Sequence, residues 1–169
     1  GDPSMPLALP EYYVVTDSIN GQASNAITDT LKALSEVVVK GRIVDENGNV
    51  LPDFNGNVFT SFFDKKMSML TLGNDPEESQ VAEFKVQKNV LFKGNNTVSN
   101  GQFTLHFIVP KDIDYSYGNG KFSYYARSNS ADAAGFFSQF LVGGNSGNHY
   151  QDNEGPQIDI YLNNLKFLS

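Results

Sequence analysis

Apolar and polar residues alternate along much of this chain, and this alternation predicts β-strands. In residues 102–109, every second residue from Phe103 to Val109 is apolar, whereas Thr104 and His106 occupy the opposite positions. Successive side chains of a strand point to opposite faces of its sheet. The segment is therefore expected to bury its apolar set in a core and to leave His106 exposed.

Further short segments show the same strand character, with turns rich in Gly and Asn between them. They lie at residues 12–16, 36–44, 58–63, 67–72, 84–92, 121–127, 135–142 and 157–162. The expected inward-facing residues of 121–127 and 157–162 are Phe122, Tyr124, Ala126, Ile158, Ile160 and Leu162. Because no helical crossovers separate these strands, the pattern predicts an all-β fold. We expect an immunoglobulin-like antiparallel β-sandwich of roughly eight to ten strands.

The first 35 residues are expected to lead into this sandwich as an extended segment. Prolines at positions 3, 6 and 10 favour an extended, linker-like chain, and residues 12–16 form a short strand candidate. Residues 29–35 (DTLKALS) are the one helix-like passage, in which Asp29 could cap a helical turn. This interpretation assigns 1–35 to a lead-in and 36–169 to one sandwich domain.

Composition narrows the classes of function. The chain carries 12 basic and 19 acidic residues, and no basic patch stands out in the sequence, so the charge pattern of a nucleic-acid binder is missing. With no cysteine, the chain has neither a disulfide nor a cysteine nucleophile. No apolar run reaches the roughly 20 residues of a membrane helix, and no signal peptide opens the chain.

The two histidines are the only candidates for the base of a serine triad. His106 falls in the middle of a strand on its polar face, where a histidine is usually a cross-strand neighbour. His149 lies in a loop rich in Gly and Asn, but no Gly-x-Ser-x-Gly motif accompanies it. No ligand-spaced partner flanks either histidine, so a zinc site is weakly supported. We therefore predict no catalytic, cofactor-binding or metal-binding residue in this chain.

Three acidic loops could supply oxygen ligands to calcium. They are Asp45–Asn49, the pair Asp112 and Asp114, and the DNEG loop at 152–155. The first lacks a terminal bidentate Glu, and its Asn47-Gly48 is a strong hairpin-turn signal. Ordinary turn chemistry is the expected role of these loops. Calcium binding by the DNEG loop stays open.

Several short phrases, taken in order, resemble a known family along almost the whole chain. They are Gly1-Asp2-Pro3, Leu7-Ala8 with Pro10, residues 29–35 (DTLKALS), 54–56 (FNG), 71–75 (TLGND), 100–103 (NGQF), 109–113 (VPKDI) and 154–156 (EGP). Together they resemble the region that follows the peptidase domain in the gingipain-type cysteine peptidase acting as the type IX secretion sortase. The catalytic Cys and His of that family belong to the preceding domain, and no residue here matches them.

The resemblance implies a non-catalytic accessory domain of an exported peptidase, associated with the cell surface or outer membrane of a Gram-negative bacterium. Its implied partners are the peptidase domain of the same polypeptide and, beyond it, secretion-system proteins or cargo. The abrupt ends at Gly1 and Ser169 fit a piece of a longer chain. The alternative is a free-standing adhesion or carbohydrate-binding module, although the chain lacks Trp, a common platform for sugars.

Overall fold

The computed structural model describes residues 10–70 and 83–147, and this part of the chain contains strands but no helix. The strands are β1 (Tyr12–Ile19), β2 (Gln22–Ala23), β3 (Thr30–Ala33), β4 (Glu36–Val44), β5 (Gly56–Phe63), β6 (Met67–Leu70), β7 (Glu83–Val86), β8 (Val90–Val98), β9 (Gln102–Ile108), β10 (Gly118–Asn119), β11 (Lys121–Ser128), β12 (Asp132–Phe137) and β13 (Leu141–Asn145). No helix long and apolar enough to cross a membrane occurs among these residues.

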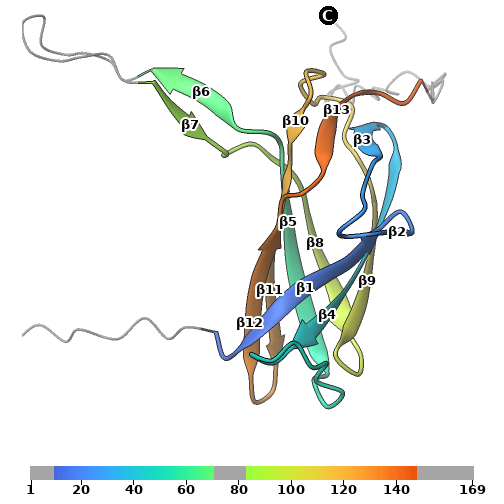
Figure 1. Ribbon diagram of the computed structural model, residues 1–169, viewed down its shortest axis with the longest axis vertical. Coiled ribbons are helices and arrows are strands. Elements are labelled where there is room, and N and C mark those ends of the chain that lie inside the picture. The colour runs from blue at the N-terminus through green and yellow to red at the C-terminus, as the bar shows by residue number, and fades with distance from the viewer. Residues whose placement is uncertain (1–9, 71–82, 148–169) are drawn as a thin grey trace, which may run out of the picture.

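One large sheet forms most of the molecule. Its strands follow the order β8-β5-β11-β12-β1-β4-β9, with β2 added beside β1. Because the end strands β8 and β9 also contact each other, the sheet curls into a nearly closed sandwich (Figure 1). A smaller sheet, β10-β13-β3, lies at one end of the sandwich, and the β6–β7 hairpin projects outward from that end. The all-β sandwich predicted from the sequence is confirmed.

The core lies between the two walls of the curled sheet and is largely aromatic. Phe62 of β5 and Phe122 of β11 are paired neighbours, both fully buried, with ring centroids 4.9 Å apart. Phe107 reaches them from β9 on the opposite wall and stacks on Phe92 of β8 at 4.4 Å. The predicted inward faces of β9 and β11 are both confirmed. Residues 157–162 lie outside the described residues.

Strand β1 is unusual because it enters the sheet parallel to β12, with Tyr12 opposite Ala133. On its other side β1 pairs antiparallel with β4. The parallel contact is close: a Cβ atom at Gly135 would collide with the carbonyl oxygen of Val14. Glycine at this position therefore permits the two backbones to approach. The pairs β1–β12 and β3–β13 are parallel, whereas the other paired strands of the described chain are antiparallel, as predicted.

The prediction of a helical turn or loop at residues 29–35 is wrong. Residues Thr30–Ala33 form β3, which pairs with β13, and both Leu31 and Ala33 are fully buried. Two turns of helix are too short to be stable alone, because helix nucleation is costly. The alternation of Leu31 and Ala33 with polar neighbours fits a strand, and tertiary pairing decides between the two. Leu34, with φ of 63°, then ends the strand.

Candidate functional site: a lysine-lined cleft

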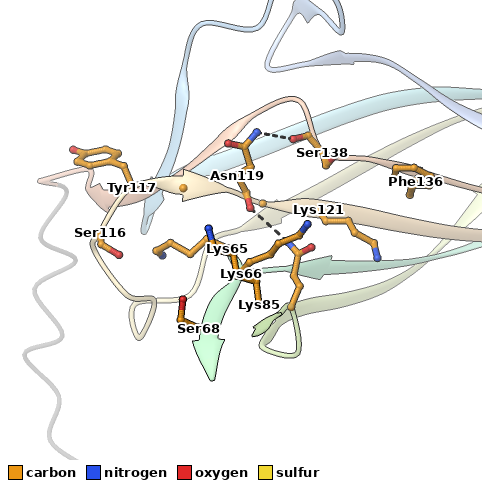
Figure 2. Close-up of a pocket in the computed structure, with 13 residues that line it drawn as sticks. Lys65, Lys66, Ser68, Lys85, Ser116, Tyr117, Asn119, Lys121, Phe136 and Ser138 are labelled. Atoms are coloured by element: carbon orange, nitrogen blue, oxygen red, sulfur yellow. Dashed lines mark hydrogen bonds between the residues drawn. The ribbon is translucent and has the colours of Figure 1, made fainter. Parts of the chain in front are cut away.

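A cleft of about 740 Å³ opens where the β6–β7 hairpin meets β10 and the start of β11. Figure 2 shows four lysine side chains around it, namely Lys65, Lys66, Lys85 and Lys121. We call this site the lysine cleft. Lys65 and Lys66 follow β5, Lys85 lies on β7, and Lys121 begins β11. The turn of the chain into the projecting hairpin thus brings together lysines that are far apart in sequence.

The charge of the lysine cleft is opposite to that of the whole chain. The chain has a net charge of −7, yet four of its 12 basic residues line this one site. No aspartate or glutamate is among the lining residues. Within the described residues, Lys66, Lys85 and Lys121 form no ion pair. The three ammonium groups therefore have no acidic partner in the described part of the chain, and those of Lys66 and Lys85 make no cation–π contact either.

Lys65 has a structural role at the base of the cleft. Its Nζ donates to Oδ1 of Asp64 at 2.9 Å and to the carbonyl oxygen of Asp114 at 2.6 Å. The backbone N–H of Lys65 donates to the same Asp64 oxygen at 2.8 Å. Both side chains are almost wholly buried. Such a buried pair holds its geometry because each charge would be costly without the other.

Two amide side chains fasten the walls of the cleft to each other. Gln87 Nε2 donates to the carbonyl oxygen of Asp64 at 2.7 Å and, more weakly, to that of Asn119 at 3.4 Å. Asn119 Nδ2 donates to the carbonyl oxygen of Ser138 at 3.0 Å (Figure 2). These bonds connect the base of the hairpin to β10 and to the end of β12. The floor of the cleft is therefore organised before any ligand arrives.

Lys121 and Phe136 connect the cleft to an exposed aromatic surface. The Lys121 ammonium lies 5.3 Å from the ring centroid of Phe63, within cation–π range. Phe136 lines the cleft and is 71% exposed. It belongs to a set of exposed rings on the outer side of β1, β5, β11 and β12, which we call the aromatic face. The members of the aromatic face are Tyr13, Phe59, Tyr125 and Phe136.

The aromatic face is continuous across neighbouring strands. Phe59 of β5 lies opposite Tyr125 of β11, and their rings stack at 6.4 Å. Tyr125 lies opposite Ala134 of β12, which in turn lies opposite Tyr13 of β1. Four adjacent strands therefore place apolar groups in one row on the outside. Contiguous exposed apolar surface of this kind commonly marks an interaction site.

Asp114 is the one sequence candidate at the lysine cleft, where its carbonyl oxygen accepts from Lys65. The other candidates lie elsewhere or outside the described residues. His106 is exposed on β9, with Nε2 4.0 Å from Oε2 of Glu36. Asp112 is exposed on the loop after β9. His149 and the DNEG loop at 152–155 lie outside the described residues. In the described part of the chain, no cluster of three His, Asp or Glu side chains could hold a metal ion.

Two of the acidic loops use their carboxylates in turns. Asp45 Oδ1 accepts from the backbone N–H groups of Asn47 and Asn49, both at 2.9 Å. These bonds, with that from the Asn49 side chain, lower the pKa of Asp45. Asp114 Oδ1 accepts from the N–H of Ser116 at 2.8 Å, and its pKa is lowered by that residue. The carboxylates of Asp45 and Asp114 are thus engaged by backbone N–H groups of their own turns.

Comparison with solved structures relates this chain to part of a larger protein. The crystal structure of dimeric latent PorU from Porphyromonas gingivalis matches 90% of this chain at 32% sequence identity, with a TM-score of 0.70. This chain is similar to one part of PorU. It spans 14% of the PorU chain, so the match concerns a small part of a much larger protein.

The other comparisons add little. The sporulation control protein Spo0M from Bacillus subtilis matches 80% of this chain and 51% of its own at 12% identity, with a TM-score of 0.43. No protein-family model matches the chain. No curated protein matches it either. PorU is therefore the relative from which a function is inferred.

Proposed function

We propose that this chain is a non-catalytic accessory domain of a PorU-like, gingipain-type peptidase of the type IX secretion system. The observation that carries the proposal is the 32% identity over 90% of the chain to a region amounting to 14% of PorU. The phrases of the sequence that resemble the region after a sortase peptidase domain support the same conclusion. In this proposal the parent protein is exported to the cell surface, and its catalytic Cys and His lie outside this chain.

The domain packs beside the peptidase domain and presents surfaces to cargo or secretion partners. The aromatic face supports a docking role, because Phe59 and Tyr125 form a stacked pair that is nearly half exposed. Aromatic side chains are enriched at the buried centres of protein interfaces. The occupant we propose for this face is the peptidase domain of the same polypeptide, since the matched region is a small part of the relative.

Peptide cleavage should distinguish this domain from its proposed parent protein. The purified chain should leave peptide substrates uncut, because it contains no thiol, and alkylating reagents should not change this result. The full parent protein should cleave peptides and lose that activity on alkylation. Turnover by the isolated chain that persists through repeated purification would contradict the proposal.

Docking is tested by binding between this chain and the peptidase domain of its parent, produced separately. The double variant Phe59→Ser/Tyr125→Ser should weaken binding by about tenfold or more, because aromatic residues that act as interface hot spots cost about 2 kcal/mol or more when truncated. The matched control is Thr104→Ala/His106→Ala on the exposed side of β9. Equal binding by both variants would place the contact elsewhere. Binding to a surface glycan, with none to the peptidase domain, would favour the adhesion module instead.

A further inference from the structure

Some polar groups of the lysine cleft are hydrogen-bonded within the protein, whereas others have no such partner. Gln87 and Asn119 donate their amide hydrogens to carbonyl oxygens of this chain, and Lys65 is held by Asp64 and Asp114. Lys66, Lys85 and Lys121 line the cleft without an acidic partner among the described residues, and the Lys121 ammonium lies over the Phe63 ring. A ligand of the cleft would therefore meet positively charged lysines around a hydrogen-bonded base.

We propose that the lysine cleft binds an acidic peptide segment. Carboxylates of an extended peptide project from one face at intervals of about 7 Å, the repeat of two residues along a strand. Lysine side chains are flexible, so their ammonium groups can pair with carboxylates at this spacing without a fixed bidentate geometry. The exposed rings of Tyr117 and Phe136 at the rim offer contacts to apolar residues between the acids.

The state of the amide side chains favours a peptide over a sugar. Neutral sugars are read through hydrogen bonds to their hydroxyl groups, and amide side chains are suited to that role because they both donate and accept. Here the amide N–H groups of Gln87 and Asn119 already donate to backbone carbonyl oxygens of the cleft walls. Charge therefore dominates recognition in this site. The inference rests on the cleft alone and does not require a parent peptidase.

The net charge of the chain makes the test selective. A protein of net charge −7 repels a polyanion in general, so binding of an acidic peptide requires a local positive site. The probe is a fluorescein-labelled oligoglutamate peptide, titrated with the full 169-residue chain at low salt and followed by fluorescence anisotropy. An oligoglutamine peptide of equal length serves as the neutral control. We expect the glutamate peptide to bind, the glutamine peptide not to bind, and added salt to weaken binding.

The decisive variant is Lys66→Glu/Lys85→Glu, since both side chains are exposed and make no ion pair in the described structure. It should weaken oligoglutamate binding by about tenfold, the effect of losing two exposed charge pairs. The matched control, Lys32→Glu/Lys111→Glu, makes the same change in net charge at two exposed lysines that do not line the cleft, and should bind within about twofold of wild type.

Three results would overturn the proposal. The first is absence of oligoglutamate binding to the wild-type chain at low salt. The second is an equal loss in the two double variants, which would show a general effect of net charge. The third is binding of a uronate-rich polysaccharide or a single-stranded oligonucleotide that depends on Lys66 and Lys85, without oligoglutamate binding. That result would assign the cleft to another class of polyanion.

Discussion

The hydroxyl oxygens of Tyr124 and Thr16 lie 2.8 Å apart inside the sandwich and join two strands that are not neighbours in the sheet. Tyr124 belongs to β11 and Thr16 to β1, and β12 separates them. Both residues are buried, so each hydroxyl finds its hydrogen-bond partner in the other. The bond therefore satisfies two polar groups in an aromatic core and fixes the position of β1 against β11.

Removing both hydroxyls should cost less than the sum of the two single removals. Thr16→Val and Tyr124→Phe each leave a buried hydroxyl unpaired, which costs roughly 1–3 kcal/mol. The double variant removes both polar groups and should be less destabilised than the sum of the single variants. Urea unfolding of the four proteins completes a double-mutant cycle. Additive losses would show that the two hydroxyls do not depend on each other.

The same tyrosine predicts a loss of stability at high pH. Burial raises the pKa of Tyr124 above the ordinary 10.0, and the bond to Thr16 opposes this only in part. The unfolded chain releases the tyrosine proton near pH 10, whereas the folded chain retains it. The contribution of Tyr124 is thus fully present below that pH and is lost as the pH rises above it.

Unfolding free energies measured from about pH 8 to about pH 11 should fall more steeply for wild type than for Tyr124→Phe. The comparison cancels the titration of the other tyrosines, which both proteins share. Parallel curves for the two proteins would contradict the assignment.

Strand β9 provides a test of register with two adjacent residues. Phe107 packs against Phe62 and Phe92, so Phe107→Ala should cost about 3–5 kcal/mol through lost burial and the cavity left behind. His106 has a side chain that is 61% exposed, and His106→Ala should cost under about 0.5 kcal/mol. Denaturant melts measure both losses. A larger effect at His106 would mean that the strand is shifted by one residue.

The base of the lysine cleft offers a similar comparison between adjacent lysines. Lys65→Met removes the partner of the buried Asp64 carboxylate and should destabilise the fold by about 3–5 kcal/mol. Lys66→Met, at an exposed position, should change stability by less than about 0.5 kcal/mol. Thermal unfolding of the two variants decides the matter. Similar melting temperatures would show that the Asp64–Lys65 pair is dispensable.

Strict alternation made the walls of the sandwich predictable from the sequence. Phe103, Phe107 and Phe122 stand at every second position of their strands, so one register buries them all and a shift exposes them. Residues 29–35 carried a mixed signal, with good helix formers in a short segment. Pairing with β13, more than 100 residues later in the chain, decided their conformation, and no local pattern reports such a contact.

The lysine cleft was not predictable, because its charges are dispersed along the sequence. Lys66, Lys85 and Lys121 lie in three different segments, and no cluster of basic residues in the sequence connects them. Only the meeting of the β6–β7 hairpin with β10 and β11 concentrates them. The buried state of Lys65 was equally invisible, since Lys65 and Lys66 are identical neighbours in the sequence and differ only in what surrounds them.

The parallel pairing of β1 with β12 constrains the order in which the strands can fold. Tyr12 and Tyr13 pair with Ala133 and Ala134, so this edge of the first strand has no neighbour until β12 has been synthesised. Closing so long a loop is slow, and contacts of high sequence separation delay folding. A chain emerging from the ribosome can form the antiparallel β1–β4 pair early, but it must leave a gap beside β1 that β12 fills later. Until then the aromatic interior stays open to solvent, and the nascent domain needs protection from aggregation.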